Sequence, residues 1–421
     1  MLEFVNLLAF LWLSLCLLFV VNRLSKGYKN VILFVYIVYY IFFATPLFFD
    51  FLIGKPNYYI YPGFAIATRD SLTECIYLIY ISAIPIIWIM TNKLNRKQHS
   101  LKSLKSYNSF IKRIYPILYL LLFIPIIAVL FSPNPIVYLK YGAAAKGLFI
   151  NESESYHFIV NLSVNISILS IICLLIFRKD KIIRYIILLS PIMFLCIWIN
   201  GKRAIVAFLA VAIGYILWQK GYLRGIKFYI SIIFAVIIFT LFTSFYQFNL
   251  RYESLGINNF FDIYENFRVD FGRDDVTKFT IYTTLYPEKG KILEYIGQSF
   301  LFDITMYIPR EFWTDKPWPY AVYMTAAIVG VPPDYIGWGM TTSILEEAIS
   351  NFSWFGMLVG PLLISFICRL GESCDHELIY LLTVLIASLF LVLQLAAFAH
   401  MVFLWIILLL IFRRKKIRII W

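Results

Sequence analysis

The sequence predicts an all-helical polytopic membrane protein with about eleven transmembrane helices and one large, largely helical extracytoplasmic loop. The 421-residue chain is 61% hydrophobic and only 14% charged, whereas soluble domains carry roughly 25% charged residues. Apolar runs close to the ~20 residues that cross a bilayer recur from end to end. The short connections between these runs alternate in Lys and Arg content, as the positive-inside rule requires.

The expected spans follow one another closely except at one long connection. The first begins with Glu3 and has no A-x-A-like site, so we expect a retained span and no cleaved signal peptide. The last two are short, and a re-entrant hairpin is the alternative there. The spans are 4–21, 31–53, 71–92, 114–133, 158–177, 183–200, 204–218, 228–247, 352–370, 378–395 and 398–412.

These spans divide the chain into three parts: a bundle over 1–247, an outer loop over 248–351, and C-terminal helices with a basic tail over 352–421. If the tail "RRKKIR" is cytoplasmic, 23 of the 37 Lys and Arg residues lie on that side. We therefore expect the N-terminus outside and the C-terminus inside. The net charge of +13 then reflects topology and indicates no nucleic-acid partner.

The six cysteines predict neither a disulfide framework nor a metal site, because none has a CxxC-like spacing. We expect no metal and no cofactor, although Asp274 and Asp275 could hold a divalent ion.

The outer loop is where chemistry or recognition is expected, because every other connection is short. Loops of this length without structure are uncommon, so it should fold over the bundle. Its stretch "EYIGQSFLFDITMYI" predicts a helix at the membrane surface, with Glu294, Gln298 and Asp303 away from the apolar side.

The first charged group on this outer face is "NGKRA", the whole connection between two spans. Lys202 and Arg203 lie at the bilayer edge on the side where positive charge is unusual. We expect them to bind an anion; the alternative is that both side chains extend along the bilayer into water.

The second group is "RVDFGRDDVTKF", which contains Arg268, Asp270, Arg273, Asp274, Asp275 and Lys278. Mixed signs at this density are typical of a solvated surface whose charges pair with one another.

The third group is "YIPREFWTDKPWPYAVY", with Arg310, Glu311, Asp315 and Lys316. Its prolines fix backbone φ and disfavour helix, so its charges should be held in set positions. Alternatively, the prolines only stiffen the loop, and Trp313 and Trp318 anchor it at the membrane interface.

Two further positions supply candidate acid–base groups. The stretch "TTSILEEAISNFSWFG" reads as a helix running into span 352–370; it brings Glu346 and Glu347 to the membrane boundary, where a carboxylate is costly unless paired or functional. Asn351 shares a helix face with Glu347. His400, near the outer end of the last span, is a candidate because histidine titrates near neutrality, although a hydrogen-bonded structural role is the commoner one.

Fixed cations and a carboxylate outside a lipid-embedded bundle suit a lipid-linked diphosphate substrate. Arg and Lys bind a diphosphate and stabilise it as it leaves. A carboxylate or histidine takes the proton of an acceptor hydroxyl. These features permit a glycosyl or phosphoryl transferase.

The order of features resembles the Wzy-type oligosaccharide repeat-unit polymerases, membrane-integral GT-C-like glycosyltransferases that make bacterial O-antigen and capsule. "IPREFWTDKP" is similar to the family pattern I-P-R-x-x-W-x-x-K-P. "EEAISNFSWFG" is similar to the family's G-E-x-x-x-N-F-G, but Glu346 and Ser353 stand where Gly is usual. The "GKR" turn resembles a basic turn of many members. The matching positions of the two longer motifs are Ile308, Pro309, Arg310, Trp313, Lys316, Pro317, Glu347, Asn351 and Phe352.

The resemblance implies that a glycan on undecaprenyl diphosphate is moved onto the non-reducing end of a new lipid-linked unit, without a metal, at the outer face of the bacterial inner membrane. It implies lipid-linked oligosaccharides as partners, together with the chain-length regulator and flippase of the pathway. The catalytic candidates are Glu347, then His400 and Glu346. The diphosphate candidates are Arg310, Lys202 and Arg203, then Lys316 and Arg273; Asn351, Trp313 and Asp315 are further substrate contacts. An O-antigen ligase, a flippase and a structural subunit of an envelope complex are the alternatives.

Overall fold

The structure is a computed structural model that describes residues 2–92, 94, 108–142, 154–178, 181–201, 203–247, 260–308, 310–374 and 376–418. Within these ranges the regular secondary structure is helical and contains no strand. The chain forms two compact units. Unit 1 comprises 1–97 and 258–421, and unit 2 comprises 98–257. The division of the chain at 247 and 351 concerns placement in a membrane and stays a prediction.

Six segments of the described chain are helical, long and apolar enough to cross a membrane. This confirms the class of helical membrane protein. The other expected spans overlap shorter apolar helices, and their number stays a prediction. The six segments are Leu2–Ser25, Val31–Leu52, Ser71–Thr91, Ile159–Phe177, Ile182–Asn200 and Ile344–Ser373, the last of which is interrupted at Ser353.

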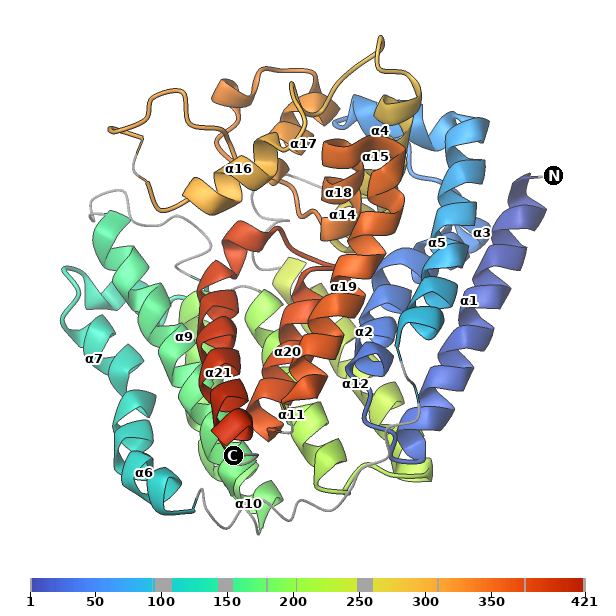
Figure 1. The fold of residues 1–421 in the computed structure, drawn as a ribbon. Helices are drawn as coiled ribbons and strands as arrows, with labels where there is room; N and C mark the ends of the chain where they lie inside the picture. The colour runs from blue at the N-terminus through green and yellow to red at the C-terminus, as the bar shows by residue number, and fades with distance from the viewer. Residues whose placement is uncertain are drawn as a thin grey trace. The chain divides into compact units, whose positions relative to one another are not determined.

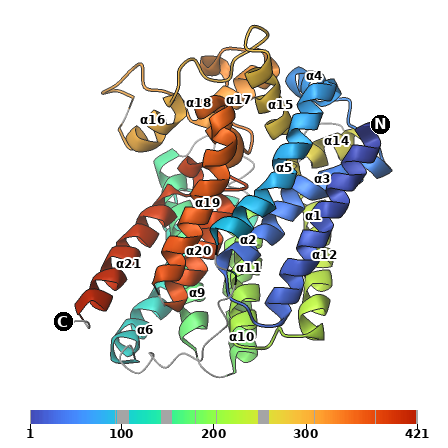
Figure 2. The same cartoon turned by 45° about the vertical axis from the view of Figure 1, so that its right-hand side comes forward.

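Unit 1 combines long apolar helices with a group of short helices at one end. In Figures 1 and 2, α4 and α15 to α17 lie beyond the ends of α20 and α21, and α18 lies beside the upper part of α19. The elements of unit 1 are α1 (Leu2–Ser25), α2 (Val31–Tyr39), the π-helix η1 (Tyr40–Ala44), α3 (Thr45–Leu52), α4 (Pro62–Arg69), α5 (Ser71–Thr91), α14 (Phe260–Phe271), α15 (Asp274–Leu285), α16 (Gln298–Thr305), α17 (Tyr320–Val329), η5 (Pro333–Tyr335), α18 (Ile344–Phe352), η6 (Ser353–Phe355), α19 (Gly356–Ser373), α20 (Glu377–Leu389), η7 (Leu395–Ala397) and α21 (Ala399–Arg418).

An apolar core fixes the short helices to one another. Phe64 of α4, Phe279 of α15 and Met324 of α17 are buried together in it. The apolar area that these side chains remove from water stabilises the arrangement. The segment after 260, which the sequence places in the outer loop, is thus a folded layer.

A helical hairpin replaces the single helix expected to run into span 352–370. α18 ends at Phe352, and Ser353 has a positive φ of 53°. α19 then returns alongside α18: Gly356 lies against the backbone of Ala348 and Ile349, and Gly360 lies against Leu345. Glycine permits both close approaches because it has no Cβ.

Substitution of Gly356 by Ala is expected to destabilise unit 1. An added Cβ would lie well inside van der Waals contact with the carbonyl of Ala348, so α18 and α19 would have to separate. We expect a loss of about 1–3 kcal/mol, measured by thermal unfolding in detergent. Gly214→Ala is the matched control, because nothing lies within 4 Å of a Cβ there; an equal effect of both variants would contradict the prediction.

Unit 2 is built around its longest helix. The side chain of Ser167 in α9 donates to the carbonyl of Leu122 in α6 at 3.0 Å, and Asn200 of α10 donates to Asn161 of α9 at 2.9 Å. These contacts connect α9 to α6 and to α10. The elements are α6 (Asn108–Leu122), α7 (Ile124–Leu130), η3 (Pro135–Leu139), α9 (Glu154–Phe177), α10 (Ile182–Asn200), α11 (Arg203–Gln219) and α12 (Ile226–Gln247).

Candidate functional site

The two cations of "IPREFWTDKP" hold the segment in shape. Arg310 donates to the carbonyls of Lys316 and Pro317 at 2.8 and 3.0 Å, and its guanidinium lies 3.5 Å from the centroid of the Trp318 ring. Lys316 donates to the carbonyls of Met306 and Ile308, both at 2.9 Å. Each cation therefore binds the backbone on the other side of the segment.

These contacts show that Lys316 binds the backbone and not its neighbour Asp315, whereas its expected contact with a diphosphate stays a prediction. Lys316 is buried and directs its ammonium at main-chain carbonyls, whereas Asp315 is exposed. Trp313 is half-buried. The segment is thus stabilised by its own charges, and Arg310 keeps part of its fork of five N–H donors for other acceptors.

Glu347 and Asn351 of α18 meet α16 at Ser299. The Ser299 hydroxyl donates to the Glu347 carboxylate at 2.7 Å. The Asn351 amide donates to Ser299 and to the Glu347 carbonyl, both at 2.8 Å. Glu347 is 1% exposed and Asn351 is fully buried. A buried carboxylate with so few donors is costly, which marks this point as a candidate site.

Asp303 brings a second carboxylate to the same face of α16. It lies one turn after Ser299, so the two residues share a helix face, and its charge interacts with that of Glu347. Burial raises the pKa of Asp303 to about 7. Its Oδ2 atom is buried without a hydrogen-bond partner among the described residues.

Glu346, the third carboxylate here, has a structural role in capping α18. It accepts from the Ser343 N–H at 2.6 Å and from the Ser343 hydroxyl. The Ser343 side chain in turn accepts from the start of the helix. This is a capping box, which satisfies N–H groups at the helix N-terminus. Of the two glutamates, Glu347 is therefore the one that contacts α16.

His400 lies exposed in the first turn of α21. Phe403, one turn later, packs against Tyr307 with ring centroids 5.7 Å apart, so α21 begins beside the segment that contains Arg310. Among the described residues, the hydrogen bonds of Glu347 do not involve His400.

The basic turn belongs to unit 2. α10 ends at Asn200, Gly201 adopts a positive φ of 67°, and α11 begins at Arg203. This confirms the tight connection. Lys202 lies outside the described residues, and its role and that of Arg203 in anion binding stay predictions.

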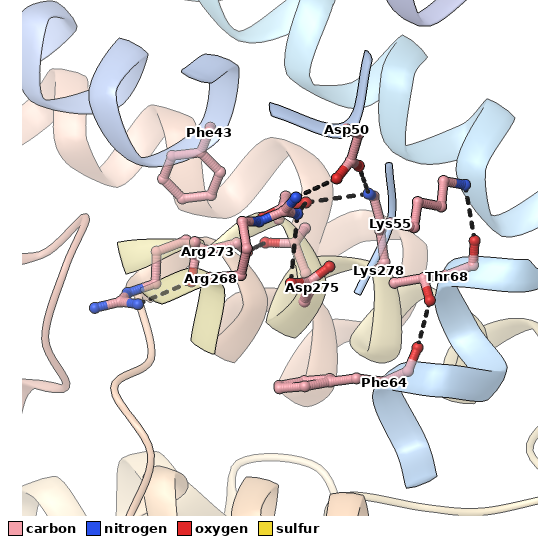
Figure 3. A network of polar contacts seen from close by, with 12 residues as sticks. Phe43, Asp50, Lys55, Phe64, Thr68, Arg268, Arg273, Asp275 and Lys278 are labelled. Atoms are coloured by element: carbon pink, nitrogen blue, oxygen red, sulfur yellow. Dashed lines mark hydrogen bonds and ion pairs between the residues drawn. The ribbon is translucent and has the colours of Figure 1, made fainter. Parts of the chain in front are cut away.

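A second group of charges is buried in unit 1. Arg268 forms ion pairs with Asp50, with Asp274 at 2.6 Å and with Asp275 at 3.5 Å. Lys278 pairs with Asp274 at 3.1 Å and with Asp50 at 3.7 Å. We call these five residues the ion cluster; Figure 3 shows its members Asp50, Arg268, Asp275 and Lys278 converging from α3, α14 and α15.

The ion cluster corrects one expectation from the sequence. Four charges of "RVDFGRDDVTKF", those of Arg268, Asp274, Asp275 and Lys278, do pair with one another, but they are buried and not solvated. The physical reason is Asp50, which adds a partner from α3 and helps to compensate both cations away from water. Tyr58 supplies a further donor to Asp275.

Arg273 takes part in packing and lies next to the cluster. It is buried, its guanidinium donates to the carbonyls of Gly272 and Val392 at 2.9 and 3.2 Å, and it lies 5.3 Å from the ring centroid of Phe42. It therefore connects the start of α15 to η1 and to the turn after α20. Its expected contact with a diphosphate stays a prediction.

The ion cluster contains three carboxylates and two cations. Burial, together with the charge of Asp274, raises the pKa of Asp275 to about 7. Burial also acts on Asp274, but Arg268 and Lys278 outweigh it and hold the pKa of Asp274 below its usual value. Asp275 is thus the carboxyl that holds a proton near neutrality.

The Asp275→Asn variant is expected to flatten the pH dependence of stability. In the wild type, the raised pKa means that folding favours protonated Asp275, so its contribution is complete near pH 4 and is lost as the pH rises to 7. The slope reaches at most about 1.4 kcal/mol per pH unit. Thermal unfolding in detergent between these pH values measures it; an unchanged slope in the variant would contradict the assignment.

The carboxylates that could have held a divalent ion are paired with cations. Asp274 contacts Arg268 and Lys278, and Asp275 contacts Arg268 and Tyr58. In the part of the chain that the structure describes, no three His, Cys, Asp or Glu side chains lie together as metal ligands.

The sequence contained little indication that several residues of these sites would take part in them. Ser299 and Asp303 appeared only as part of an amphipathic stretch. Asp50 lies near the end of an apolar run, 218 positions from Arg268. An acidic residue at the end of a span was the one available sign.

No family model, curated protein or solved structure matches this chain.

Proposed function

We propose that the chain is a membrane glycosyltransferase that polymerises lipid-diphosphate-linked oligosaccharides, of the Wzy type. One observation carries the proposal: the two motif stretches that resemble this family, 308–317 and 346–352, both contact α16. Lys316 binds the carbonyls directly after α16 and lies 5.0 Å from the ring centroid of Phe302. Glu347 and Asn351 bind Ser299 one turn earlier.

A chain of contacts links the proposed diphosphate ligand to the proposed base. Arg310 stacks on the ring of Trp318, and the backbone N–H of Trp318 donates to the Tyr323 hydroxyl at 3.1 Å. That hydroxyl accepts from Gln298 at 2.9 Å, and Gln298 precedes Ser299. α16 thus supports both groups, which favours a shared site.

In the proposed reaction, Glu347 is the general base and Arg310 binds the donor diphosphate. The acceptor hydroxyl gives its proton to Glu347, and its oxygen bonds to the anomeric carbon of the donor. The bond from that carbon to the diphosphate breaks, and the electron pair leaves on the diphosphate oxygen, which Arg310 stabilises. Attack opposite the leaving group inverts the anomeric centre.

Because Glu347 is buried, the proposed reaction requires a movement of α16. Since the carboxylate is 1% exposed beneath α16, the acceptor reaches it only when α16 moves away from α18. Lid movements of this kind are common in transferases.

The proposal includes about eleven spans, an outside N-terminus, a cytoplasmic C-terminus and an outward-facing site in the bacterial inner membrane. The start of α1 and the short helices lie at the same end of unit 1 in Figures 1 and 2, as this topology requires. The partners are undecaprenyl-diphosphate-linked donor and acceptor, with a chain-length regulator and a flippase of the same pathway.

Purified protein incubated with one lipid-linked repeat unit tests the function. We expect a ladder of products on a gel and release of the lipid diphosphate. A single transfer to a different acceptor would instead identify a ligase, and movement of the lipid across vesicles without a new bond would identify a flippase. No elongation of native substrate, where a control polymerase is active, refutes the proposal.

A further inference from the structure

An apolar cavity lies between α1, α2 and α5, which belong to three of the six segments long and apolar enough to cross a membrane. α1 packs against both other helices, and the cavity has a volume of about 260 Å³. It is open on one side, where its lining residues Leu15 and Ile89 are exposed. In a helical membrane protein, this open side faces lipid chains and not water.

The polar groups of the aromatic walls are already used by the protein. The indole N–H groups of Trp12 and Trp88 and the Tyr36 hydroxyl each donate to a backbone carbonyl, at 3.2, 3.1 and 2.8 Å. Among the remaining lining side chains, Cys16 adds only a weakly polar thiol. Water needs two to four polar partners in a cavity, so this one suits a hydrocarbon chain.

Arg23 lies at one end of the cavity, one turn beyond its lining residues Phe19 and Val20. Its guanidinium is 5.1 Å from the centroid of the Phe19 ring and donates to the carbonyl of Leu94, another lining residue, at 3.3 Å. Within the described ranges, the ion pairs of unit 1 do not include Arg23. An arginine has five N–H donors, so its fork can bind a further acceptor at this end.

The sequence around this end of the cavity is basic. The stretches "NRLSKGYK", at the end of α1, and "KLNRK", after α5, contain six Lys and Arg residues and no acid. Glu372 of α19 contacts the start of α2, where it accepts from the Val31 N–H at 2.6 Å. Basic pockets between transmembrane helices bind anionic lipid headgroups.

We propose that this cavity binds one chain of an anionic phospholipid whose phosphate is held by Arg23. The chain lies along α1 beside Trp12 and Phe19; at a rise of 1.5 Å per residue, Arg23 is about 16 Å from Trp12 along the helix. The lipid belongs to the leaflet in which α1 ends. That end of α1 points away from the short helices in Figures 1 and 2, so the lipid site is separate from the proposed catalytic site and does not depend on the proposed function.

Native mass spectrometry of the purified full-length protein tests the headgroup. Titrations with dioleoyl phosphatidylglycerol and dioleoyl phosphatidylcholine compare an anionic and a zwitterionic headgroup on the same chains. We expect one phosphatidylglycerol to bind more tightly, and Arg23→Gln to weaken it about five-fold and remove the preference, as expected for one basic residue at an anionic lipid. Arg69→Gln, at an exposed position of α4, should keep both. Equal affinity of the wild type for the two lipids overturns the proposal.

A second variant tests the chain. Cys16→Phe places a ring at a half-buried position of the lining and should abolish the phosphatidylglycerol site while circular dichroism shows a folded protein. Cys75→Phe makes the same change at a half-buried position of α5 outside the lining and should retain the site. Undiminished binding in Cys16→Phe overturns the proposal, as does displacement of phosphatidylglycerol by a lower concentration of an isoprenyl phosphate. If Cys16→Phe does not fold, the Arg23→Gln comparison decides alone.

Discussion

Replacing Glu347 by Gln should abolish the product ladder while leaving the protein folded. Gln has nearly the same shape and still accepts the hydrogen bond from Ser299, but it cannot take a proton from the acceptor hydroxyl. General bases contribute about 10²–10⁴-fold to rate, so the expected loss is of that size. Product per unit time on the gel, normalised to folded protein, measures it.

The control for this variant is Glu288→Gln, which makes the same chemical change on an exposed loop of unit 1. Glu346→Gln forms a second comparison, because Glu346 contacts Ser343 in the helix cap. Full activity in Glu347→Gln would remove its role as the base. Loss of the ladder in Glu346→Gln alone would transfer that role to Glu346.

Replacing Arg268 by Met should be the most destabilising single change in the ion cluster. Arg268 pairs with Asp50, Asp274 and Asp275, and without it Lys278 alone faces three buried carboxylates. Removing one partner of a buried ion pair typically costs about 3–5 kcal/mol. Unfolding in detergent, followed by circular dichroism, measures the change.

Two comparisons isolate the role of charge in this variant. Arg69→Met removes the same side chain from an exposed position and should change the free energy of unfolding by less than about 0.5 kcal/mol. Adding Asp274→Asn to Arg268→Met should recover part of the loss, because it removes one uncompensated charge. A stability loss in Arg268→Met no larger than in Arg69→Met would show that the ion cluster does not stabilise unit 1.

The membrane class was predictable because long apolar runs leave few structural choices. A backbone in lipid must satisfy its own hydrogen bonds, so such runs form helices. The tight connection at Gly201 was also readable, since two apolar runs leave almost no chain between them. These features depend on local sequence alone.

The candidate site was less predictable because its contacts join distant parts of the chain. Glu347 was identified from its position at a membrane boundary, but its partner Ser299 lies 48 positions away. The burial of Arg268 depended on Asp50, and sequence proximity to Asp274 suggested only a surface pair. The α18–α19 hairpin required a positive φ at Ser353, an uncommon conformation for that residue type.

Because α16 covers Glu347, it affects whether the acceptor hydroxyl or water attacks the donor, a competition that every transferase faces. Water is an abundant competitor for an activated sugar, and a base that stood open would promote hydrolysis of the donor and terminate the polymer. A carboxylate that is uncovered only when α16 leaves α18 links its reactivity to the arrival of the acceptor. Under the proposed function, the burial of Glu347 therefore favours transfer to the acceptor over hydrolysis. A variant with a weakened contact between α16 and α18 should hydrolyse more of the donor.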